Sequence, residues 1–216
     1  TRLKVLLMLT LDQARQWYTK ADPVHDFEHV LRVYRLAERI GEVEGADLGI
    51  LLAAVLLHDS ADAAPDGESD RPTHQHASAE FARKVLIEEG WPEDRTEAVQ
   101  HCIRAHRFRG DEAPQTLEAK ILFDCDKLDV TGAIGVARSF AYAALAGQPL
   151  TAEVSEKFKA TFEKEPGEPH TPYHEFLFKL SRVRFHTATA RALAEERQRY
   201  LAGYFERLAR EVKGEA

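Results

Sequence analysis

The stretch AVLLHDSAD, residues 54–62, ends an apolar run on a histidine and an aspartate. Residues 54–57 are typical of a buried helix, whereas His58 and Asp59 carry ionisable side chains. Burial of an imidazole beside a carboxylate costs several kcal/mol unless other groups compensate for the lost water. The sequence therefore predicts that another part of the chain supplies a partner for this pair.

Apolar residues recur at helical spacing through most of the chain, and no stretch alternates apolar and polar residues over the length of a strand. One such stripe contains Val30, Val33, Ala37 and Ile40. The spacing predicts helices over residues 10–20, 26–44, 46–59, 76–89, 93–107, 116–128, 131–146, 151–162 and 173–212, with the last one broken. We therefore expect an all-α helical bundle that forms a single domain.

The composition excludes several classes of partner. The chain has 216 residues and a net charge of -7, so no global positive field favours long nucleic acid or an anionic membrane. The two cysteines, Cys102 and Cys125, form no CxxC motif, which argues against a disulfide framework and favours a cytoplasmic protein. The opening TRLKVLLML is too short for a signal-peptide core or a membrane span.

Two further segments carry polar residues of the kind that bind metals. His29 shares a helical face with Val33 and Ile40, and the segment AKILFDCDKLDV, residues 119–130, brings in Asp124, Asp126 and Asp129. A divalent cation would offset the carboxylate charges and use the imidazole lone pairs. A set of two histidines and two aspartates suits Mn, Fe, Co, Ni or Mg better than Zn. A single buried histidine can also be a core residue bonded to a backbone carbonyl.

The order of these residues resembles the signature of the HD-domain metal-dependent phosphohydrolases, which is a His, an adjacent His-Asp pair and a distant Asp. The likeness is nearest to a bacterial branch that includes manganese-dependent deoxynucleoside triphosphate pyrophosphohydrolases, through DFEHVLRV (26–33) and DCDKLDVTGAIGVAR (124–138). It implies an HD-type domain over residues 1–216, with a metal-site core over about 22–146 and C-terminal helices over about 151–212 packed on it.

Carried over residue by residue, the resemblance assigns metal ligation to four positions: His29, His58, Asp59 and Asp126. His25, four residues before His29, is the rival for the first ligand. Other HD enzymes carry two acids after the pair, whereas HDSADA here keeps only Asp62 and has Ala63 in the second position. We expect Asp62, together with Asp59, to take part in catalysis by orienting or deprotonating a water on the ion. A loop-capping role for Asp62 is the alternative.

The substrate-binding candidates lie on the basic and histidine-rich segments. His106 shares a helical face with Val99 and Ile103, whereas His101 does not, so His106 is the better candidate for a cleft. In some two-metal HD proteins a histidine near a helix start and another in an IxxH segment bind the second ion, and His76 and His106 resemble them. We favour one ion, with these residues binding phosphate or acting as acids. The full set of substrate-binding candidates is His76, Arg104, His106, Lys127 and Lys179.

The sequence thus predicts a cytoplasmic hydrolase that acts on a small nucleotide with one divalent ion, manganese first. Within this class, we expect pyrophosphate release from (deoxy)nucleoside triphosphates, with monophosphate dephosphorylation as the second choice. A metal- or nucleotide-binding sensor without catalysis is the competing class, because the second acid after Asp62 is missing. The apolar positions of the last helices allow a homodimer, and we expect neither long nucleic acid nor a membrane as a partner.

Overall fold

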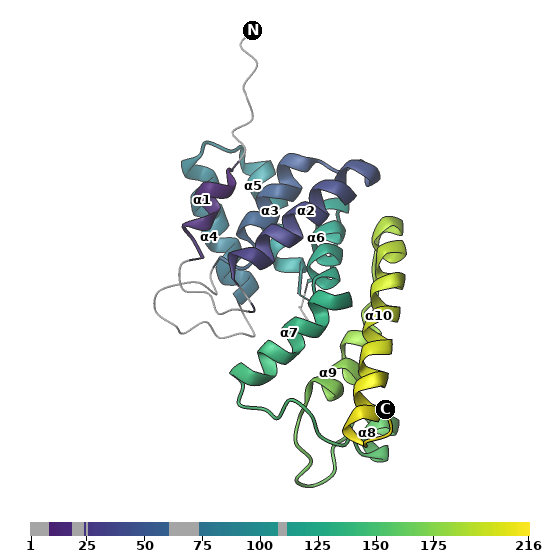
Figure 1. Cartoon of the computed structure of the whole chain (residues 1–216). Helices are drawn as coiled ribbons and strands as arrows, with labels where there is room; N and C mark the ends of the chain where they lie inside the picture. Colours follow the sequence, from purple (N-terminus) through teal and green to yellow (C-terminus); the bar gives the residue numbers. More distant parts are fainter. Residues whose placement is uncertain (1–8, 19–23, 25, 61–73, 108–111) are drawn as a thin grey trace. The chain divides into compact units, whose positions relative to one another are not determined.

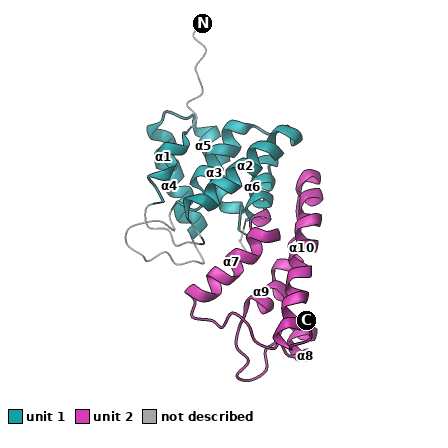
Figure 2. Cartoon of the chain, viewed as in Figure 1, with its two compact units in different colours: residues 1–126 teal, residues 127–216 magenta. Residues whose placement is uncertain are grey.

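The chain is all-α, as the apolar spacing predicts. The computed structural model describes residues 9–18, 24, 26–60, 74–107 and 112–216, and these contain ten α-helices, one short 3-10 helix and no strand. They fall into two compact units, residues 1–126 and residues 127–216, which Figure 2 colours separately. The single domain expected over residues 1–216 stays a prediction.

The first unit is built around one apolar helix, α3 (Leu48–Leu57). Every residue of α3 from Leu51 to Leu57 is buried, as expected of a helix that is apolar on all sides. It packs against α2 (Phe27–Glu44), α4 (His74–Glu88), α5 (Glu93–Ala105) and the short α1 (Leu11–Arg15), and α6 (Leu117–Leu128) starts in the same unit (Figure 1). The core of this unit therefore surrounds the helix that leads into the His58-Asp59 pair.

Local capping sets the ends of α2 and α3. The carboxylate of Asp26 accepts a hydrogen bond from the His29 N–H at the start of α2, and Asp47 accepts one from the Ile50 N–H at the start of α3. Gly45 ends α2 with a left-handed conformation, φ 77°. The Arg95 guanidinium binds both carboxylate oxygens of Asp47, and this hydrogen bonding lowers the pKa of that carboxyl. The short 45–47 connection is thus held at both of its ends.

The second unit contains α7 (Gly132–Leu145), α8 (Glu156–Thr161), α9 (Pro172–Phe178), a 3-10 turn (Leu180–Arg182) and α10 (Ala188–Val212). Its core is an aromatic and aliphatic cluster in which Phe176 and Phe205 stack with ring centroids 4.8 Å apart. The last predicted helix is broken as expected, between Arg182 and Ala188. The predicted helix over 151–162 begins later, at Glu156, because the Ser155 side chain caps it.

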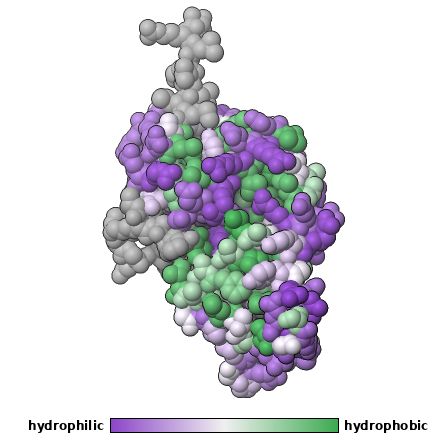
Figure 3. Space-filling model, viewed as in Figure 1, coloured by the Kyte–Doolittle hydropathy of each residue, from purple (hydrophilic) through white to green (hydrophobic). Residues whose placement is uncertain are grey.

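Apolar side chains also reach the surface of the second unit. Ile134, Tyr142 and Leu145 of α7 are 38–56% exposed, and Figure 3 shows hydrophobic residues gathered over this helix. Among the described residues, no helix combines the length and the apolar character that a membrane crossing demands.

Gly135 allows the start of α7 to pack closely against the preceding turn. A Cβ at this position would lie 2.6 Å from the Val130 carbonyl carbon, and would clash with its oxygen as well. The substitution Gly135→Ala should therefore lower the free energy of unfolding by about 1–3 kcal/mol, as overpacking does. Chemical denaturation measures this difference.

Gly203 in α10 is the matched control, since a Cβ there would meet no atom within 4 Å. Gly203→Ala should raise the free energy of unfolding by up to about 1 kcal/mol, because alanine favours a helix interior over glycine. Equal effects of the two substitutions would contradict the role assigned to Gly135.

Candidate metal centre

The first turn of α2 places His29 in the core of the first unit. His29 is the third residue of the helix, its backbone N–H is bound by Asp26, and its side chain is only 1% exposed. The Asp26 cap removes one of the unpaired N–H groups of the first turn. The same-face prediction for His29 is therefore right: the imidazole faces inward rather than toward water.

The end of α3 delivers His58 and Asp59. His58 is the C-cap residue, and its Nδ1–H donates to the carbonyl of Val55 at 2.7 Å. This bond assigns the proton to Nδ1, so the Nε2 lone pair is available to a ligand. Both side chains are buried, with His58 fully enclosed and Asp59 9% exposed.

His106 repeats this arrangement at the end of α5. It is the C-cap residue, is buried, and its Nδ1–H donates to the Ile103 carbonyl at 2.6 Å. His74 is the first residue of α4 and is 13% exposed. The rings of His29, His58, His106 and His74 follow one another edge to face, with successive centroids 5.2–5.5 Å apart.

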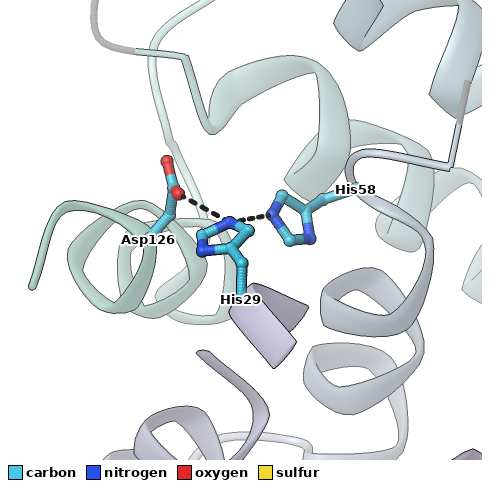
Figure 4. A group of neighbouring side chains, drawn as sticks. All are labelled: His29, His58 and Asp126. Atoms are coloured by element: carbon cyan, nitrogen blue, oxygen red, sulfur yellow. Dashed lines mark hydrogen bonds and ion pairs between the residues drawn. The ribbon is translucent and has the colours of Figure 1, made fainter. Parts of the chain in front are cut away.

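Figure 4 shows the first cluster, in which the His29 ring lies between His58 and Asp126. The Nε2 atom of His29 lies 3.4 Å from Nε2 of His58, 3.4 Å from Oδ1 of Asp126 and 3.7 Å from Oδ2 of Asp59. His29 can offer at most one proton at this atom, whereas three acceptor atoms surround it. A hydrogen atom cannot satisfy this cluster, but a bound cation would.

Asp59 joins this cluster to a second one. Its Oδ2 atom lies 3.5 Å from Nε2 of His58, and its Oδ1 atom lies 3.5 Å from Nε2 of both His74 and His106. Two groups of possible ligands result: His29, His58 and Asp126, and then Asp59, His74 and His106, with ligand atoms in each group within 4.8 Å of one another. Ligands of one ion bound at about 2.1 Å are separated by roughly 3.0–3.5 Å, close to the 3.4–3.7 Å between neighbouring ligand atoms here.

The protonation states also suit a cation. Burial lowers the pKa of His58 to about 4, so this imidazole is neutral at pH 7. Burial raises the pKa of Asp59, but its contacts with His58, His106 and His74 outweigh burial and hold that pKa well below the usual range, so the carboxylate is ionised. Neutral imidazoles and ionised carboxylates are the forms in which these side chains bind metals. The residues present therefore fit a divalent ion.

The remaining residues predicted from the sequence lie in several different environments. His106 lies beside Asp59, as its helical face suggests, but the neighbouring histidine is His74 rather than His76. Arg104 binds Glu97 and Glu112, which offsets its charge. Lys127 follows Asp126 on α6 but belongs to the second unit, as does Lys179, which binds Glu175 at 2.9 Å. His25, Asp62 and Ala63 lie outside the described residues.

The sequence identifies a pair of candidate histidines at the start of α4 but does not choose between them. The segment THQHAS, residues 73–78, offers two histidines, and the predicted helix starts at 76, whereas α4 starts at His74. Two residues correspond to about 200° around a helix, so the two imidazoles project in nearly opposite directions. The choice between them depends on where Asp59 lies, which periodicity cannot show.

The lowered pKa of His58 predicts how the metal-free protein responds to acid. His58 titrates at about 4 in the folded protein and near 6.5 when unfolded, so the unfolded chain binds more protons between these values. The free energy of unfolding should therefore fall as the pH decreases from 6.5 to 4, by up to about 3 kcal/mol from this group. Chemical denaturation across this range, with His58→Gln as the comparison, isolates the contribution; parallel curves would contradict it.

Comparison with known proteins places this arrangement in a family. Residues 26–131 match the HD domain family, and they include all six residues of the two clusters. The uncharacterized protein YpgQ of Bacillus subtilis (strain 168) is 32% identical over 213 residues, which cover 94% of each protein.

Solved structures of similar proteins also have this fold. The crystal structure of Bacillus subtilis YpgQ in complex with ADP superposes with a TM-score of 0.73 at 32% identity, over 96% of this chain and 100% of that one. An HD-superfamily hydrolase from Bacillus thuringiensis gives a TM-score of 0.68 at 28% identity, over 93% of both chains. The chain belongs to the HD domain family and is a hydrolase of the HD superfamily.

Proposed function

We propose that the protein is a metal-dependent phosphohydrolase that releases pyrophosphate from (deoxy)nucleoside triphosphates. The observation that carries this proposal is the position of Asp59, a buried carboxylate with imidazole Nε2 atoms 3.5–3.7 Å from both of its oxygens. Such a group is costly to bury unless cations compensate it. Phosphate esters and anhydrides are the substrates that a divalent centre of this type favours.

The proposal assigns residues to two metal positions. His29, His58, Asp59 and Asp126, the same four ligands that the sequence predicts, would hold the first ion. Asp59, His74 and His106 would hold a second ion, in addition to the single ion that the sequence suggests. The nitrogen and oxygen donors favour Mn, with Fe, Co, Ni or Mg as alternatives.

When bound, a divalent ion at such a centre polarises a phosphate oxygen and makes a bound water more acidic. The protein's own contribution is preorganisation. His58 and His106 are fixed by their Nδ1–H bonds to carbonyls, so their Nε2 atoms need not reorient during the reaction. Asp59 keeps its negative charge at neutral pH because of its depressed pKa, and it therefore acts as a ligand rather than as a proton donor. Asp62 remains our candidate for the general base.

The nucleotide substrate is supported by the relative that was crystallised with ADP, since that protein matches this chain over nearly its whole length. ADP contains a phosphoanhydride, which is the bond type that pyrophosphate release from a triphosphate breaks. Lys127, Lys179, Arg104 and His106 stay candidates for contacts with the phosphates. Release of phosphate from nucleoside monophosphates is the second candidate, and product analysis distinguishes the two.

The decisive experiment is a manganese-dependent screen across nucleoside mono-, di- and triphosphates, with identification of the product. Asp126→Ala should reduce turnover at least about 10³-fold, because it removes a carboxylate whose Oδ1 lies 3.4 Å from His29 Nε2. Glu206→Ala, which removes an exposed carboxylate on α10, is the control and should retain activity. Metal binding without turnover on any nucleotide would instead favour a sensor.

A second pair of variants tests the other cluster. His74→Ala should lower the number of metal ions bound per chain and reduce turnover roughly 10- to 100-fold, since it removes an imidazole 3.5 Å from Asp59. His76→Ala tests the assignment made from the sequence and should have the smaller effect on both quantities. Metal content by elemental analysis, measured beside steady-state kinetics, decides between them. A larger effect of His76→Ala would reverse the assignment.

A further inference from the structure

Tyr18 connects the two helix ends that present the first cluster. Its hydroxyl donates to the Leu56 carbonyl near the end of α3, with the two oxygens 3.0 Å apart. Its ring packs against the ring of Phe27, the first residue of α2, with centroids 5.6 Å apart and planes tilted by 52°. Tyr18 and Phe27 are 7% and 5% exposed. One buried side chain therefore contacts both elements.

The contact at Leu56 completes the C-terminal end of α3. The last carbonyls of a helix lack partners within that helix. Here the Val55 carbonyl accepts from His58 Nδ1–H, the Leu56 carbonyl accepts from Tyr18, and the Leu57 carbonyl accepts from the backbone N–H and the hydroxyl of Ser60. Among the donors that the described residues provide to these three carbonyls, Tyr18 is the one that lies outside residues 58–60. Loss of its hydroxyl would remove a buried hydrogen bond from the Leu56 carbonyl, directly before His58 and Asp59.

The contact between Tyr18 and Phe27 lies close in sequence to the candidate ligand His29. Phe27 precedes His29 by two residues in the first turn of α2. The adjacent Trp17 meets Phe81 of α4 edge to face, with centroids 5.7 Å apart, and α4 is the helix that begins with His74. Residues 17 and 18 therefore contact α2, α3 and α4, three helices whose ends carry candidate ligands.

We propose that Tyr18 is a positioning residue that sets the separation between His29 and the His58-Asp59 pair by joining the ends of α2 and α3. This inference rests on the proposed metal-dependent function. Substitution Tyr18→Phe keeps the ring on Phe27 and removes only the hydroxyl. The end of α3 then shifts to hydrate the Leu56 carbonyl, and the ligand atoms no longer match one ion.

Titration of the metal-free full chain with Co²⁺ tests this inference without relying on turnover. Tyr18→Phe should weaken Co²⁺ affinity roughly tenfold, as loss of a group that orients ligands does, and should change the visible absorption bands of the bound ion. Tyr18→Leu, which also removes the ring contact with Phe27, should weaken the affinity further. Thermal denaturation of each metal-free variant shows whether it is folded under the conditions of the titration.

Gln198→Met is the matched control. The Gln198 side chain donates to the Val183 carbonyl at 3.3 Å, so this substitution also removes a side-chain bond to a carbonyl, but in the second unit and on α10, which carries no candidate metal ligand. It should leave the affinity and the absorption bands unchanged. Equal affinity and equal spectra of Tyr18→Phe and wild type would overturn the inference, as would equal losses in Tyr18→Phe and Gln198→Met. Absence of Co²⁺ binding by the wild type would instead refute the proposed metal centre, and this role of Tyr18 with it.

Discussion

The constraint on which the first unit depends is the burial of one carboxylate, Asp59, among four imidazoles. An isolated ionised carboxylate in a protein core is strongly unfavourable, and a neutral histidine whose proton is fixed on Nδ1 has no Nε2–H to donate to it. His58 has this tautomer, since its Nδ1–H is bound to the Val55 carbonyl. The nitrogen and oxygen lone pairs therefore face one another with too few N–H donors to form hydrogen bonds between them. Such an arrangement is typical of a cation-binding site.

Helix ends are the means by which the fold meets this constraint. His29 lies in the first turn of α2, His74 begins α4, and His58 and His106 are the C-cap residues of α3 and α5. At both C-caps the imidazole uses Nδ1 to satisfy a carbonyl of its own last turn and directs Nε2 away from it. The Nδ1–H bond therefore satisfies a carbonyl at the helix C-terminus and also orients Nε2 as a metal ligand. Helix stability and site geometry depend on the same contact.

Two of the basic residues predicted to bind phosphate are already paired with acidic side chains. Arg104 is held by Glu97 and Glu112, and Lys179 is held by Glu175, so these charges are already offset within the protein. Arg138 binds Asp129 in the second unit. The net charge of -7 gives no global positive field for long nucleic acid. Under the proposed function, a phosphate group would therefore be held mainly by the metal ions.

Hydrophobic periodicity alone determined that the chain is helical, that His29 and His106 face inward, and that the His58-Asp59 pair ends a buried helix. The order of His, His-Asp and Asp was enough to identify the family. Only the tertiary structure decided that His74 rather than His76 accompanies Asp59, that Arg104 is paired with glutamates, and that Tyr18 joins α2 to α3. The physical reason is that periodicity reports which face of one helix is apolar, whereas a ligand set depends on distances between helices. His74 and His76 are only two positions apart in the sequence, yet on a helix their side chains point in nearly opposite directions.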